Sequence, residues 1–86
     1  MRLLFVGGPV DNTEIAYDGG EPPAHYPPDT GSGHSRYRLH LVGRAGGAPV
    51  YAVYGAPDLA ASEVNGTAAE RDYARRFSVD EESAPT

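Results

Sequence analysis

Apolar and polar positions alternate most clearly in the middle of the chain. Tyr37, Leu39 and Leu41 occupy every second position, the period-2 pattern of a strand with one buried face and one exposed face. Residues 50–54 are rich in β-branched and aromatic side chains, which favour a second strand. The glycines between the two segments suit the positive φ values of a tight loop, so residues 36–54 predict a hairpin. The polar residues of the first strand, which we place on the exposed face, are Arg36, Arg38 and His40.

A second hairpin is predicted at the start of the chain. Residues 2–6 form a nearly continuous apolar run, which is typical of an interior strand that is buried on both faces. Residues 7–12 are rich in glycine, proline, aspartate and asparagine, which favour turns. Residues 13–17 then return as a strand, with Thr13, Ile15 and Tyr17 facing the core.

A helix is predicted near the end of the chain. Thr67 and Glu70 have the spacing of a capping box, in which the first residue caps the helix and the second bonds back to its amide. From there the helix is expected to run to Phe77. Ala69, Tyr73 and Phe77 are four residues apart and give it an apolar stripe that packs against the sheet.

These elements predict an α+β fold of four antiparallel strands in two hairpins, with one C-terminal helix across a face of the sheet. A small, partly open β-barrel is the alternative arrangement. Residues 55–66 are interpreted as a connector with one helical turn across residues 58–63. Residues 1–77 are expected to form one domain, because 86 residues give only a small core. Residues 78–86 are acidic and poor in apolar side chains, so we expect a frayed tail.

A long loop is predicted at residues 18–35. Eight of these eighteen residues are glycine or proline, which excludes a helix or a central strand. Residues 22–28 favour the extended polyproline II conformation, which loses little entropy on binding. One interpretation is a binding loop that displays His25 and Tyr26. The alternative is a solvated connector whose tyrosine packs back on the sheet.

Composition and charge narrow the classes of partner. The net charge is −5 and every basic residue apart from histidine is arginine; this acidity disfavours nucleic acid, because affinity there comes from neutralising phosphates. No apolar run approaches the roughly 20 residues of a membrane span. The apolar run at the start of the chain is also too short for the hydrophobic region of a signal peptide. The absence of cysteine fits a reducing compartment. We therefore expect a cytoplasmic protein without a membrane or nucleic-acid partner. The arginine, alanine, glycine and proline bias indicates a high-GC bacterium or its phage.

Candidate chemistry is sparse. His25 and His34 share the loop with Asp18 and Asp29, so a metal cluster is geometrically conceivable. Their spacing matches none of the short histidine motifs of metal sites. Serine lies near His34, but nothing in the sequence supplies an orienting third group or an oxyanion hole. We expect no enzyme activity, no metal and no cofactor.

Three segments carry a resemblance to known proteins. They are residues 5–11, Phe-Val-Gly-Gly-Pro-Val-Asp, the proline-rich residues 21–28, and Tyr-Arg-Leu at residues 37–39. In this order they resemble small uncharacterised proteins of actinobacteria and their phages. The resemblance covers roughly residues 1–54 and implies an origin, but no chemistry.

Protein binding is the predicted class of function. Tyrosine and arginine are enriched at the energetic centres of protein interfaces. We expect a small accessory protein that binds another protein, and the alternative is a phage virion or assembly component that self-associates. The candidate binding residues are His25, Tyr26, Arg36, Arg38 and Tyr51.

Overall fold

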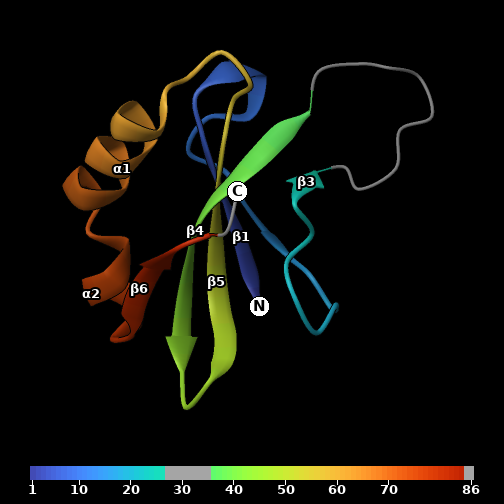
Figure 1. Ribbon diagram of the computed structural model, residues 1–86, viewed down its shortest axis with the longest axis vertical. Helices are drawn as coiled ribbons and strands as arrows, with labels where there is room; N and C mark the ends of the chain where they lie inside the picture. Colours follow the sequence, from blue (N-terminus) through green and yellow to red (C-terminus); the bar gives the residue numbers. More distant parts are fainter. Residues whose placement is uncertain (27–35, 85–86) are drawn as a thin grey trace.

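The computed structural model describes residues 1–26 and 36–84, which form a six-stranded mixed sheet with two helices (Figure 1). The predicted α+β class is confirmed. The strands are β1 (Arg2–Val6), β2 (Glu14–Ala16), β3 (His25–Tyr26), β4 (Tyr37–Ala45), β5 (Ala48–Gly55) and β6 (Asp80–Ser83). The helices are α1 (Ala61–Glu70) and α2 (Tyr73–Phe77), and a 3₁₀ turn spans Gly8–Val10.

Both predicted hairpins are present, but the sheet that joins them is not wholly antiparallel. The antiparallel pairs β1–β2 and β4–β5 match the prediction. The two hairpins meet where β1 runs parallel to β5, with Leu3 opposite Ala52. The strand order is β2-β1-β5-β4-β3. The predicted four-stranded antiparallel sheet is therefore wrong in strand number and in this central pairing.

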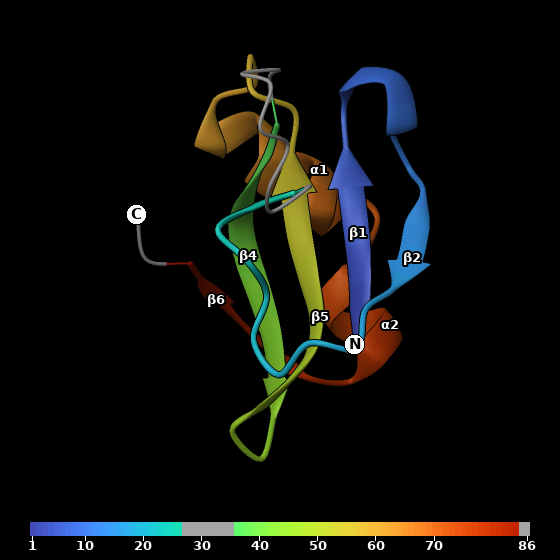
Figure 2. The same cartoon turned by 90° about the vertical axis from the view of Figure 1, so that its right-hand side faces the viewer.

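The sheet is open rather than closed into a barrel. One edge is β2, and the other edge is the outer side of β4, which two short strands share. β3 pairs with the beginning of β4, where His25 lies opposite Arg38. β6 pairs with its later half, where Glu82 lies opposite Val42. Figure 2 shows β2 and β6 on opposite sides of the sheet, so the barrel alternative is not confirmed.

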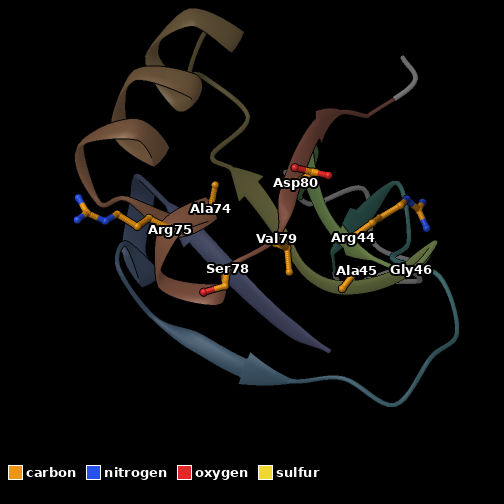
Figure 3. Close-up of a pocket in the computed structure, with 8 residues that line it drawn as sticks. All are labelled: Arg44, Ala45, Gly46, Ala74, Arg75, Ser78, Val79 and Asp80. Atoms are coloured by element: carbon orange, nitrogen blue, oxygen red, sulfur yellow. The ribbon is translucent and has the colours of Figure 1, made fainter.

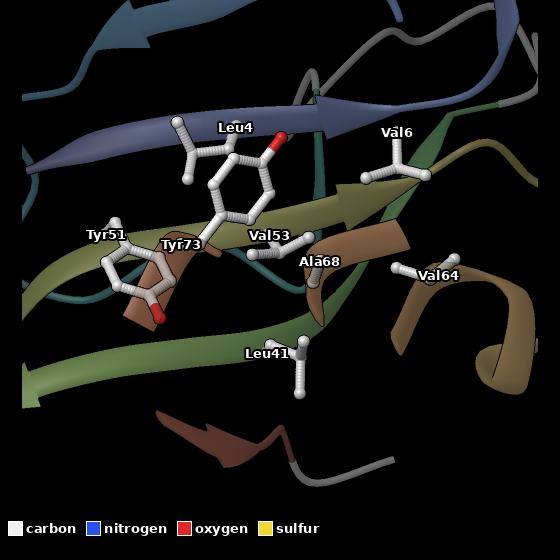
Figure 4. Packing of buried hydrophobic residues seen from close by; sticks show 8 residues of the cluster. All are labelled: Leu4, Val6, Leu41, Tyr51, Val53, Val64, Ala68 and Tyr73. Carbon is white, nitrogen blue, oxygen red and sulfur yellow. The ribbon is translucent and has the colours of Figure 1, made fainter. Parts of the chain in front are cut away.

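The two faces of the sheet are covered differently. Both helices pack on one face, whereas residues 18–26 run over the other (Figure 1). The core under the helices, shown in Figure 4, consists of Leu4, Val6, Leu41, Tyr51, Val53, Val64, Ala68 and Tyr73. On the opposite face, Leu3, Phe5, Ala52 and Tyr54 form a second buried cluster. We call this second face the helix-free face.

The C-terminal helix starts earlier than predicted and is broken. α1 begins at Ala61 with Ala60 as its N-cap, so Thr67 lies inside the helix and does not cap it. Instead, the Glu63 carboxylate accepts a hydrogen bond from the Ala60 amide. The helix ends before Asp72, whose φ of 59° is left-handed, and α2 follows. Among the described residues, no helix has the length and apolarity to cross a membrane.

A bulge in β4 reverses the alternation that the sequence predicts. Leu39 lies opposite Tyr54 and Leu41 lies opposite Val53, so His40 is an extra residue between two ladder positions. Leu39 therefore packs on the helix-free face and Leu41 under the helices. The prediction that these two leucines share a face is wrong. His40, which we placed on the exposed face, is only 9% exposed.

The predicted frayed tail contains the last strand of the sheet. Residues 80–83 form β6 and pair antiparallel with β4. The Tyr51 hydroxyl donates to Glu81 at 2.6 Å, and the Arg44 guanidinium donates to Glu82 at 2.7 Å. Side chains of the sheet thus hold an acidic segment that has little strand propensity of its own.

Candidate functional site

Four aromatic rings gather on the helix-free face. Phe5 of β1 lies at their centre, with its ring centroid 5.2 Å from Tyr37, 5.7 Å from Tyr26 and 5.7 Å from Tyr54. The Phe5 and Tyr37 rings meet edge to face, a favourable geometry for aromatic pairs. These residues come from four different strands, so the cluster exists only in the folded sheet.

A solvent-open groove of about 310 Å³ lies beside this cluster. We call it the aromatic groove, and its lining residues are Phe5, Val10, Thr13, Ile15, Tyr26 and Tyr37. Val10 is 41% exposed and is the one large hydrophobic residue that is exposed in the described part of the chain. The lining is almost wholly apolar, and no charged side chain contributes to it.

The glycine-rich turn after β1 fixes one wall of the groove. The Tyr37 hydroxyl donates to the Gly7 carbonyl at 2.6 Å and accepts from the Val10 amide at 3.2 Å. Gly8 has a φ of +67°, and a Cβ there would lie 2.5 Å from the Tyr37 hydroxyl oxygen. A side chain at position 8 would therefore displace Tyr37. This contact explains the glycine at position 8 of the turn.

The structure separates the predicted binding residues. Tyr26 lines the aromatic groove, and half-buried His25 precedes it in β3. Arg36 is half-buried beside the start of β4, and Arg38 is exposed on it. Tyr51 lies in the core under the helices and is fully buried; burial and the Glu81 carboxylate raise its pKa. It therefore offers no surface to a partner.

The first half of the predicted long loop is fastened to the sheet. The Tyr54 hydroxyl donates to the Pro23 carbonyl at 2.6 Å, and Arg44 pairs with Glu21 at 2.9 Å. The Leu39 amide donates to the Ala24 carbonyl at 2.9 Å. Tyr26 packs back on the aromatic cluster, as the connector interpretation expected. Residues 27–35, with His34 and Asp29, lie outside the described residues.

A larger depression of about 400 Å³ lies between α2, the β4–β5 turn and the start of β6 (Figure 3). Its cationic residues are Arg44 and Arg75. The Arg44 guanidinium is already bonded to Glu21 and Glu82, and Arg75 points away from the other labelled side chains. This depression therefore offers no set of converging polar groups. Within residues 1–26 and 36–84, no group of three or more His, Asp and Glu side chains could hold a metal ion.

The chain matches no protein-family model, no curated protein and no solved structure. The resemblance to small actinobacterial and phage proteins therefore stays a prediction. Sequence reasoning found Tyr26 but missed Val10, Thr13 and Ile15, which it assigned to a turn and a core-facing strand. The available signal was a valine within a turn, since an apolar residue there has no neighbours to bury it.

Proposed function

We propose that this chain is a small non-enzymatic accessory protein that binds another protein through the aromatic groove. The observation that carries the proposal is the open, apolar groove on the face opposite the two described helices. Small-molecule pockets usually add a few polar groups that orient the ligand. Here the Tyr37 hydroxyl already bonds to Gly7 and Val10. An apolar side chain of a protein partner fits this lining better than a polar metabolite.

The free edge of β2 suggests how the partner would present that side chain. Met1 and Tyr17 exchange both backbone hydrogen bonds, at 3.0 and 2.9 Å. Backbone groups alternate in direction along an antiparallel ladder, so Glu14 and Ala16 between the bonded positions turn their amides and carbonyls outward. An extended segment of a partner can add to this edge and project alternate side chains over Ile15.

The charge on this edge does not oppose such pairing. Glu14 is the one charged residue of β2, and its carboxylate is 2.6 Å from the Arg76 guanidinium. Charged side chains are a common defence of edge strands against pairing. At β2 the charge of Glu14 is neutralised by Arg76, so it does not prevent another strand from pairing with this edge.

Site-specific cross-linking tests the proposal. A photo-reactive residue at Val10 should capture one protein from a high-GC actinobacterial lysate in a defined ratio. The same residue at Ala45, which is exposed at the end of β4, is the matched control and should not capture it. Equal capture from both positions would contradict binding at the groove.

Self-association is the second candidate, because the same open β2 edge can pair with that of another copy. This is the arrangement expected of a virion or assembly component. Cross-linking from Val10 would then yield only dimers of the chain, and sedimentation would show twice the monomer mass. A monomer that captures a different protein would contradict it.

A further inference from the structure

A third, smaller cavity lies beside β4, where α1 begins. Its volume is about 100 Å³, the space of about three water molecules. The residues that line it are Arg38, Leu39, His40, Ala61, Asn65, Ser83 and Ala84. They come from β4, α1 and the end of β6, and none of them contributes to the aromatic groove.

His40 is the buried polar group of this cavity. The β4 bulge places its ring against the end of β5, where a Cβ on Gly55 would lie 3.1 Å from its Nε2. The residue is 9% exposed, and its imidazole makes no hydrogen bond with the described residues. Among the described residues, no fully buried side-chain nitrogen or oxygen lacks a partner, so the ring nitrogens are open to the cavity. An imidazole that is mostly buried and opens into a small cavity is placed to bind a ligand there.

The other polar groups around the cavity are donors suited to an anion. Arg38 makes no ion pair with the described residues, so its guanidinium is available. Asn65 and Ser83 add an amide and a hydroxyl. Ala61 is the first residue of α1, and the first amides of a helix have no acceptor within it and attract negative charge.

The distribution of charge supports an anion rather than a cation. The chain carries twelve acidic residues against seven basic ones, yet no carboxylate lines this cavity. Glu63, in the first turn of α1, uses its carboxylate to accept a hydrogen bond from the Ala60 amide. The described side chains that line this cavity are thus cationic or neutral, although the chain as a whole is acidic.

We propose that this cavity binds phosphate or the phosphate group of a small molecule, held by Arg38, His40, Asn65 and the start of α1. Arg38 supplies a forked, charge-assisted contact. His40 donates from its ring when it is protonated, and Asn65 and Ser83 complete the set of donors. The site is separate from the proposed protein-binding groove and does not depend on it.

Phosphate titration of the full chain tests this site by NMR. We expect inorganic phosphate, added at constant ionic strength, to shift the His40 imidazole signals with saturation and a dissociation constant of about 1 mM. The phosphate should also raise the pKa of His40, because an anion stabilises the imidazolium. Acetate measures the contribution of charge alone and should bind more weakly.

Two variants and a control assign the binding to this cavity. Arg38→Gln should weaken phosphate binding about tenfold, because it removes a charge-assisted contact. Asn65→Ala should weaken it less, and Arg75→Gln, which alters an exposed arginine outside the cavity, should leave it unchanged. No saturable shift with phosphate, a preference for acetate, or an equal loss in Arg75→Gln would each overturn the proposal.

Discussion

The ring of Tyr51 lies directly over Gly43 on the neighbouring strand. The two residues are opposite each other in the β4–β5 ladder, and a Cβ on Gly43 would lie 2.2 Å from Cε2 of the tyrosine. Tyr51 is fully buried, with its hydroxyl bonded to Glu81. The ring therefore has no free direction in which to move.

Gly43→Ala should lower the free energy of unfolding by about 1–3 kcal/mol, because the added methyl group overpacks the core. Denaturant unfolding followed by circular dichroism measures the change. Gly66→Ala is the matched control. Gly66 lies within α1 and no atom would contact a Cβ there, so alanine should stabilise the protein by about 0.5–1 kcal/mol. Equal changes in unfolding free energy for the two variants, with the same sign, would contradict the close packing of Tyr51 on Gly43.

Acidification should destabilise the protein through His40. Burial, with the nearby positive charge of Arg38, lowers the pKa of His40 below its ordinary 6.5. The folded state thus favours the neutral ring, and its stability is complete above pH 6.5 and falls as the pH drops toward the lowered pKa. Urea unfolding in a phosphate-free buffer between pH 7.5 and 5.5 measures this loss. His40→Gln should flatten the profile; an unchanged profile would show that another group causes the dependence.

Arg71 should contribute more to stability than its neighbour Arg75. Its guanidinium donates to the Phe5 carbonyl at 3.3 Å and to Asp11 at 2.8 Å, which ties the helices to the β1–β2 turn. Arg71→Met should therefore cost about 1–2 kcal/mol of unfolding free energy. Arg75→Met, which removes an exposed pair at 3.7 Å, should cost less than about 0.5 kcal/mol. Similar losses in thermal unfolding would contradict this ranking.

Removal of the last strand should destabilise the whole domain. A chain that ends after Val79 loses the β4–β6 ladder and the contacts that Glu81 and Glu82 make with Tyr51 and Arg44. We expect a loss of roughly 2 kcal/mol or more, since these bonds include a partly buried one and a charge-assisted one. A free energy of unfolding equal to that of the full chain would mean that these residues are a frayed tail after all.

Local patterns predicted the local structure. The alternation in residues 36–54 and the turn at residues 7–12 each specify a hairpin whose partners are close in sequence. The parallel pairing of β1 with β5 could not be predicted in this way, because it joins segments about fifty residues apart. The continuous apolar run of β1 did indicate burial on both faces, and that inference is consistent with its central position.

The remaining differences come from tertiary contacts that override local preference. Thr67 and Glu70 have a capping-box spacing, yet α1 begins seven residues earlier, where the Glu63 carboxylate accepts a hydrogen bond from the amide of the N-cap Ala60. The bulge at His40 moves a polar side chain into the interior, and no feature of the sequence marks a bulge. Both the aromatic groove and the phosphate cavity join residues from distant strands. Only Tyr26 of the groove and Arg38 of the cavity were among the predicted binding residues.

The most direct test of the proposed function is the affinity of the partner captured at Val10 for two variants of the chain. Val10→Asp places a charge at the rim of the groove without touching the core. Ala45→Asp places the same charge at the exposed end of β4, outside the groove. We predict that Val10→Asp weakens binding at least about tenfold, because a carboxylate in an apolar contact must be desolvated. Ala45→Asp should bind as the unaltered chain does. Full affinity in Val10→Asp, or an equal loss in Ala45→Asp, would contradict binding at the groove.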